Sequence, residues 1–172
     1  MARTLRALLH IRRQIDDARE ELAPLEDDLK VQRSGVFRYH HPLSSSSEYR
    51  THLELAQREM AELIKEGVAV EGGSSCTFNG SVEQGSGLVV EWSMLMLRAY
   101  NAEAENCLLM VRASSGRVAL KRLERAADDV NRLGARLGLK ISPRYSALRT
   151  YELELTVDHL RKKLEERKRK AA

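Results

Sequence analysis

The sequence predicts a mainly α-helical protein with a small β-hairpin or three-stranded element (α+β). Of its 172 residues, 31% are charged and only 5% are aromatic, which is typical of long solvated helices and not of a β-sandwich. Apolar residues recur at three- and four-residue steps, and short extended runs next to glycines interrupt this pattern. We expect a long N-terminal coiled-coil-like helix, a compact helical core and a projecting C-terminal helix.

The first element, within residues 1–33, is predicted to be an amphipathic helix. Its apolar residues take the alternating steps of coiled-coil core positions: Leu8, Ile11, Ile15, Ala18, Leu22, Leu25 and Leu29. Pro24 removes a backbone donor and clashes with the preceding turn, so we expect a kink or break near it. Two interpretations remain open. The helix folds back on its own chain, or it pairs with a partner, most simply in a homo-oligomer through residues 5–29.

Residues 34–160 are predicted to form the compact helical domain. Ser45 and Glu48 are three apart and precede an apolar periodic set, so they make the capping box of a helix that closes at Gly67. The surrounding serines are also compatible with a flexible linker, but the capping register favours an ordered helix start.

Short extended segments lie on either side of that helix. Val36–Tyr39 can form a strand before it, and Val68–Val70 follows it, ahead of a glycine-serine turn and the run Cys76–Gly80. We expect the last two runs to pair as a hairpin, with the first as a candidate third strand. The hairpin should lie on the helices, because an isolated hairpin is marginally stable in water.

Residues 88–111 predict a central helix that is packed on several sides. Charged residues of alternating sign interrupt it at seven-residue intervals: Glu91, Arg98, Glu105 and Arg112. Seven residues are close to two helical turns, so these side chains share one stripe that needs water or a partner. We predict a binding or specificity-setting cluster here, whose alternative role is only to fix helix packing: Arg98, Tyr100, Asn101 and Glu105.

Two further helices are expected after a Ser-Ser-Gly break at residues 114–116. The second begins at Ser142-Pro143, and residues 161–172 form a basic helical end that connects to a following domain. A basic helix face is usually only solvated, but DNA binding through phosphate contacts is an alternative function. The residues that would make those contacts are Arg122, Arg125, Arg132, Arg136, Lys168 and Arg169.

Three ordered blocks of the chain resemble one family. Residues 80–107 contain GSVEQG and then LMLRAYNAEAENC, which looks like the hallmark of the SNIPE-associated domain. The earlier block SGVFRYHHPLSSSSEYRTHL is similar to the family's glycine-aromatic turn and helix start. The later block ISPRYSALRTYELELTVDHLRKKLEERKRK is similar to its closing helix. The resemblance covers about residues 30–170.

Members of this family typically continue into a GIY-YIG-type nuclease domain and are linked to defence against bacteriophage. Neither Gly-Ile-Tyr nor Tyr-Ile-Gly occurs in this chain, so the nuclease is expected to be lost in this member or to lie beyond Ala172. The resemblance implies a non-catalytic module that recognises a phage or host envelope protein and positions an attached nuclease. A purely structural coiled-coil dimeriser is a further alternative.

The sequence presents no catalytic or metal-binding constellation. Glu103 and Glu105 are two apart and point in different directions on a helix, and His40-His41 has no cysteine or carboxylate at a helpful spacing. We expect no enzymatic activity, cofactor or metal. Two cysteines favour a reducing cytoplasm, and no apolar run approaches the ~20 residues of a membrane span. Partners could hold the chain at the inner face of the membrane.

Overall fold

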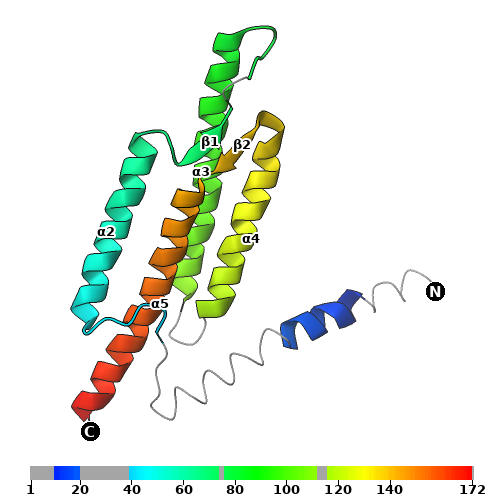
Figure 1. Cartoon of the computed structure of the whole chain (residues 1–172). Coiled ribbons are helices and arrows are strands. Elements are labelled where there is room, and N and C mark those ends of the chain that lie inside the picture. Colours follow the sequence, from blue (N-terminus) through cyan, green and yellow to red (C-terminus); the bar gives the residue numbers. More distant parts are fainter. Residues whose placement is uncertain (1–9, 20–38, 74–75, 112–115, 172) are drawn as a thin grey trace, which may run out of the picture. The chain divides into compact units, whose positions relative to one another are not determined.

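The computed structural model describes residues 10–19, 39–73, 76–111 and 116–171 (Figure 1). They fall into two units, Met1–Arg38 and Tyr39–Ala172, which we describe separately. In the first unit residues 10–19 are helical, and Ile11 and Ile15 are about half exposed. The rest of the expected N-terminal helix, including Pro24, lies outside the described residues. The coiled coil and its oligomer therefore remain predictions.

Long helices build the second unit, which confirms the mainly α-helical fold class. They are α2 (Ser46–Lys65), α3 (Val82–Met110), α4 (Gly116–Gly134) and α5 (Pro143–Ala171). Figure 1 shows α5 beside α2 on one side and next to the α3–α4 pair on the other, in agreement with the contacts between these elements. The core consequently lies along α5.

Serine side chains start two of these helices. Ser45 Oγ accepts the backbone N–H of Glu48 over 3.3 Å, as the capping pattern predicts. Ser81 Oγ accepts the N–H of Gln84 over 3.2 Å, so α3 begins at Val82, earlier than the apolar stretch alone indicates. Local side-chain chemistry thus defines both starts.

The small sheet pairs different strands from those expected. β1 (Val70–Gly72) pairs antiparallel with β2 (Leu139–Ile141), and the predicted hairpin with Cys76–Gly80 is wrong. Leu139 and Ile141 are buried, while Lys140 points outward and meets Glu71 across the strands over 3.3 Å. The pair ties the α2–α3 connection to the α4–α5 connection.

The segment before α3 closes on itself in a tight turn. Phe78 and Ser81 exchange backbone hydrogen bonds of 3.0 and 2.9 Å, and both Asn79 and Gly80 have positive φ, at 52° and 77°. Asn-Gly with positive φ at both central positions is the signature of a type I′ turn. Since the turn satisfies these groups locally, this segment does not extend the β1 strand.

Apolar side chains from all four helices and from β2 form one core. Its best-buried members include Leu63, Met96, Tyr100, Cys107, Leu123, Leu139, Tyr145 and Leu153. Within the described parts of the chain, none of the helices has the length and apolar character that crossing a bilayer would require.

Candidate functional site

A buried polar network joins α2, α3 and α5 around Arg149. Its side chain is 11% exposed and donates from Nη1 to Glu152 Oε2 over 2.7 Å, while the Glu152 side chain is 3% exposed. Gln57 of α2 donates to the other oxygen of Glu152 over 2.9 Å. A buried ion pair requires good geometry and further hydrogen bonds to offset its desolvation, and this pair has both.

Helix α3 supplies the remaining acceptors of the network. Arg149 Nε donates to Asn101 Oδ1 over 3.1 Å, and the Tyr145 hydroxyl donates to the same oxygen over 2.8 Å. Arg149 Nη1 also lies 3.3 Å from Glu105 Oε1. Burial by itself lowers the pKa of Arg149, but Glu152 and Tyr145 together outweigh it, and the pKa lies above its usual value. The guanidinium therefore stays charged.

The structure brings part of the predicted α3 cluster together. Asn101 and Glu105 share Arg149 as a partner. Tyr100 is 1% exposed in the core, where its ring lies 6.4 Å from that of Tyr145 and burial raises its pKa to about 12. Arg98 is exposed and makes no ion pair with another described residue.

A second polar cluster holds the segment before α2 against α5. Asp158 is fully buried and accepts the backbone N–H of His41 over 2.7 Å, with His40 Nδ1 3.2 Å from its other oxygen. His41 Nε2 lies 2.9 Å from Glu154 Oε2. The two histidines thus meet carboxylates that lie more than a hundred positions along the chain, which their local spacing does not reveal.

Tyrosines and serine extend this cluster along α5. The Tyr49 hydroxyl donates to the His41 carbonyl over 2.6 Å, and Tyr39 donates to Glu165 over 2.7 Å. Burial and the Glu165 carboxylate raise the pKa of Tyr39. Ser46 donates through both its N–H and its hydroxyl to Glu166, over 3.1 and 3.0 Å. Helix α5 is therefore held as far as Glu166, and residues 167–171 are exposed.

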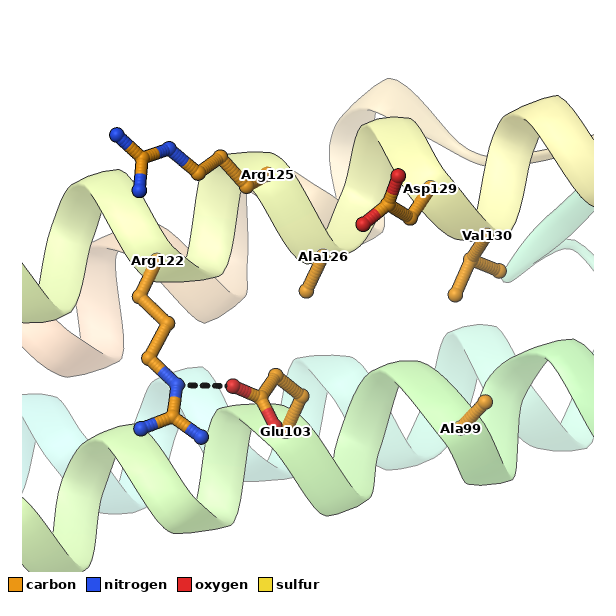
Figure 2. Close-up of a pocket in the computed structure, with 7 residues that line it drawn as sticks. All are labelled: Ala99, Glu103, Arg122, Arg125, Ala126, Asp129 and Val130. Carbon is orange, nitrogen blue, oxygen red and sulfur yellow. Dashed lines mark hydrogen bonds and ion pairs between the residues drawn. The ribbon is translucent and has the colours of Figure 1, made fainter. Parts of the chain in front are cut away.

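An open groove lies between α3 and α4 (Figure 2). Arg122 reaches from α4 to hydrogen-bond Glu103 on α3, and Figure 2 shows Arg125 directed away from α3. The hydrogen bond from Arg122 holds the pKa of Glu103 below its usual value. Ala99, Ala126 and Val130 supply an apolar lining. The charges of this groove are matched within the protein.

Several of the basic residues considered for DNA contacts form ion pairs inside the chain. Arg122 pairs with Glu103, Arg132 lies 2.7 Å from Asp129, and Arg169 lies 2.6 Å from Glu165. Arg125 and Lys168 also interact with other groups, and Arg136 is exposed on the short 3₁₀ turn η1 (Ala135–Leu137). DNA binding stays an alternative prediction for this chain.

Sequence reasoning missed the residues at the centre of both clusters. The sequence predicts the last helix from Ser142-Pro143, but not that Arg149, Glu152 and Asp158 on it lie against other helices. The available signal is that each follows an apolar residue by three or four positions and so shares its face of α5: Tyr145, Leu148 and Leu155. Among the described residues, no three His, Cys, Asp or Glu side chains gather as a metal site requires.

Comparison with known proteins gives one match. The family model described as the SNIPE associated domain matches residues 46–164. These residues run from the first residue of α2 to within the C-terminal half of α5, and they include the Arg149 network, Glu154 and Asp158, but neither the segment before α2 nor Glu165 and Glu166. No curated protein matches the chain, and no solved structure does.

Proposed function

The chain belongs to the SNIPE-associated domain family, and on this ground we propose that it is a non-catalytic recognition module of a bacterial phage-defence protein. It binds a phage or host envelope protein and so positions an attached GIY-YIG-type nuclease. The family match over residues 46–164 is the observation that carries the proposal.

The use of ionisable groups within the fold supports a binding role. Glu152 and Asp158 are buried and Arg149 is only 11% exposed, and each is engaged by partners inside the protein, so they offer little access to a substrate. Catalytic acids and bases need to contact the reacting groups in a cleft. These carboxylates instead form contacts within the fold. Glu152 pairs with Arg149, and Asp158 and Glu154 hold His41 in the segment before α2.

The N-terminal end of α3 offers a surface for the partner. Figure 1 shows these first turns extending past α4 and the strand pair. Phe78 is 48% exposed and Val82 is 67% exposed, next to the hydrogen-bonded Asn79-Gly80 turn. Neighbouring apolar side chains that a fold leaves in water commonly mark a protein interface. We take this end of α3 as the contact site.

Pull-down with the purified full chain tests the proposal. Tagged chain is mixed with individually expressed candidate phage injection proteins and host envelope proteins, and the binding affinity of any partner is then measured by calorimetry. Replacing Phe78→Ser together with Val82→Ser should weaken binding by at least about ten-fold, the loss expected for an apolar anchor. Leu133→Ser on α4, where the side chain is 65% exposed, is the matched control and should bind normally.

Phage infection provides a second test of the proposed function. In a defence protein that carries this domain and a nuclease, deletion of the domain should abolish protection while the nuclease still cleaves DNA in vitro. Protection that survives the deletion overturns the proposal. Turnover of a substrate by the 172-residue chain itself, lost on a single side-chain replacement, also overturns it.

A further inference from the structure

The solvent face of α3 has a heptad pattern that packing within the unit does not use. Leu95, Ala102 and Leu109 lie seven residues apart and are exposed, with exposed fractions of 56% for Leu95 and 83% for Leu109. Glu91, Arg98 and Glu105 follow the same interval and are exposed as well. With one apolar position per heptad and a charged residue three positions after Leu95 and Ala102, this is a narrow apolar row edged by charges, narrower than a two-position coiled-coil seam but sufficient for a weak helix–helix contact.

The row is symmetric about Ala102. Leu95 and Leu109 lie seven residues before and after it, while Arg98 lies four before and Glu105 three after. Two such helices related by a two-fold axis at Ala102 run antiparallel. Leu95 then faces the partner's Leu109, and Arg98 faces the partner's Glu105. In-register parallel pairing would instead place like charges together, which is unfavourable.

We propose that this face of α3 binds the same face of a second copy of the chain, antiparallel, with the two-fold axis at Ala102. The small Ala102 side chain lets the two helices approach closely, and two Arg98–Glu105 pairs flank the apolar centre. Glu105 remains available for this contact, because its side chain is 59% exposed although Arg149 lies 3.3 Å from it. The inference is independent of the proposed recognition role, which uses the N-terminal end of the helix.

The contact should be weak and reversible. Two crossing helices bury less than the roughly 1,200 Å² at the low end of stable interfaces, so we expect dissociation in the micromolar range. Sedimentation of the full chain at increasing concentration measures it. The position of the axis distinguishes this contact from any pairing through residues 5–29.

A single cysteine on the axis provides the sharpest test. In the full chain, Ala102→Cys faces the partner's equivalent residue and should form a disulfide-linked dimer under mild oxidation. Glu124→Cys on α4, also exposed, is the matched control and should crosslink at least about ten-fold more slowly. The unsubstituted chain reports any background from Cys76, since Cys107 is buried.

Charge reversal tests the register. Arg98→Glu and Glu105→Arg should each weaken self-association by at least about ten-fold, because like charges then face each other. A mixture of the two variants should regain dimers, since both contacts in the mixed pair are again of opposite sign. Glu105→Arg also loses its contact with Arg149, so melting curves check that this variant remains folded. If it unfolds, the register is tested by Arg98→Glu alone, through its effect on the crosslinking rate of the Ala102→Cys chain.

Three outcomes overturn the inference. One is a chain that sediments as a monomer up to about 0.5 mM and does not crosslink through residue 102. The second is crosslinking that Arg98→Glu leaves unchanged. The third is equal crosslinking at positions 102 and 124. A failure of partner binding in the pull-down leaves these measurements unaffected, so the two proposals fail separately.

Discussion

Arg149 on α5 donates through Nε to the amide oxygen of Asn101 on α3, across 3.1 Å and between segments that are 48 residues apart. The same oxygen accepts the Tyr145 hydroxyl, so the orientation of the Asn101 amide is determined by two donors. The guanidinium also meets Glu152, which Gln57 of α2 holds from the other side. This chain of polar contacts joins three helices at the edge of the core, with Glu152 buried and Gln57 and Glu105 exposed.

Removing one charge of the buried pair should be costly. Glu152→Ala leaves the Arg149 guanidinium buried without its main counter-ion, so we expect the free energy of unfolding to fall by about 3 kcal/mol. Urea unfolding followed by circular dichroism measures it. The control is Glu62→Ala on α2, which breaks an exposed pair with Lys65 and should change stability by less than about 1 kcal/mol. Equal losses in the two variants would contradict the structural role assigned to the network.

The helices could be predicted because their signals are local. Ser45 and Pro143 mark helix starts through chemistry that acts within one turn, and the apolar periodicity of α4 extends over several turns. The partner of β1 could not be predicted in this way. Strand β2 has three residues, too few for an alternation pattern to stand out, and its pairing with Val70–Gly72 depends on the long-range packing of α4 and α5.

The polar clusters show the same division between local and distant information. The sequence of α3 marks Asn101 and Glu105 as polar positions in an apolar helix, but it gives no sign that Arg149 is their partner. Arg149 and Glu152 are three apart on α5, a spacing that is common for solvated surface pairs. Only the packing of α2 and α3 against that side of α5 buries them. Their role therefore could not be read from the sequence of α5 alone.

Asp158 should determine how firmly the segment before α2 is held. Asp158→Ala removes the acceptor of the His41 N–H and the neighbour of His40, leaving polar groups without partners. We expect limited proteolysis to cut within residues 39–45 at least several-fold faster than in the unchanged chain. The control is Glu154→Ala, which loses only the contact with His41 Nε2 at a half-buried site. Faster cutting in the control than in Asp158→Ala would refute this account.

His159 should make stability depend on pH. Burial lowers the pKa of its imidazole, and Lys163 and Arg50 lower it further, while Ser46 and Glu166 act in the opposite direction. Its Nδ1 has no hydrogen-bond partner among the described residues. The unfolded chain therefore binds a proton at a higher pH than the folded chain, and stability falls as pH decreases through that interval.

Replacement of His159 isolates this contribution. Because His159→Gln cannot titrate, its free energy of unfolding should fall less than that of the unchanged chain between about pH 7.5 and pH 5.5. Urea titrations at both pH values measure the difference. Parallel losses in the two proteins would show that other groups cause the pH dependence.

Two glycines on the first turns of α3 should respond to alanine with opposite signs. A Cβ at Gly85 would lie 2.1 Å from the backbone oxygen of Cys76, so Gly85→Ala must displace the segment that runs across the helix start. A Cβ at Gly87 would meet nothing within 4 Å, and this glycine is helical and exposed. Gly87→Ala should raise the free energy of unfolding by about 0.5–1 kcal/mol through helix propensity alone. Gly85→Ala should lower it by more than that amount, since backbone has to move.

Urea unfolding of both variants gives the comparison. Stabilisation by both would mean that the Cys76–Thr77 backbone does not pack against α3, and the Phe78–Val82 surface would then lose its rigid support.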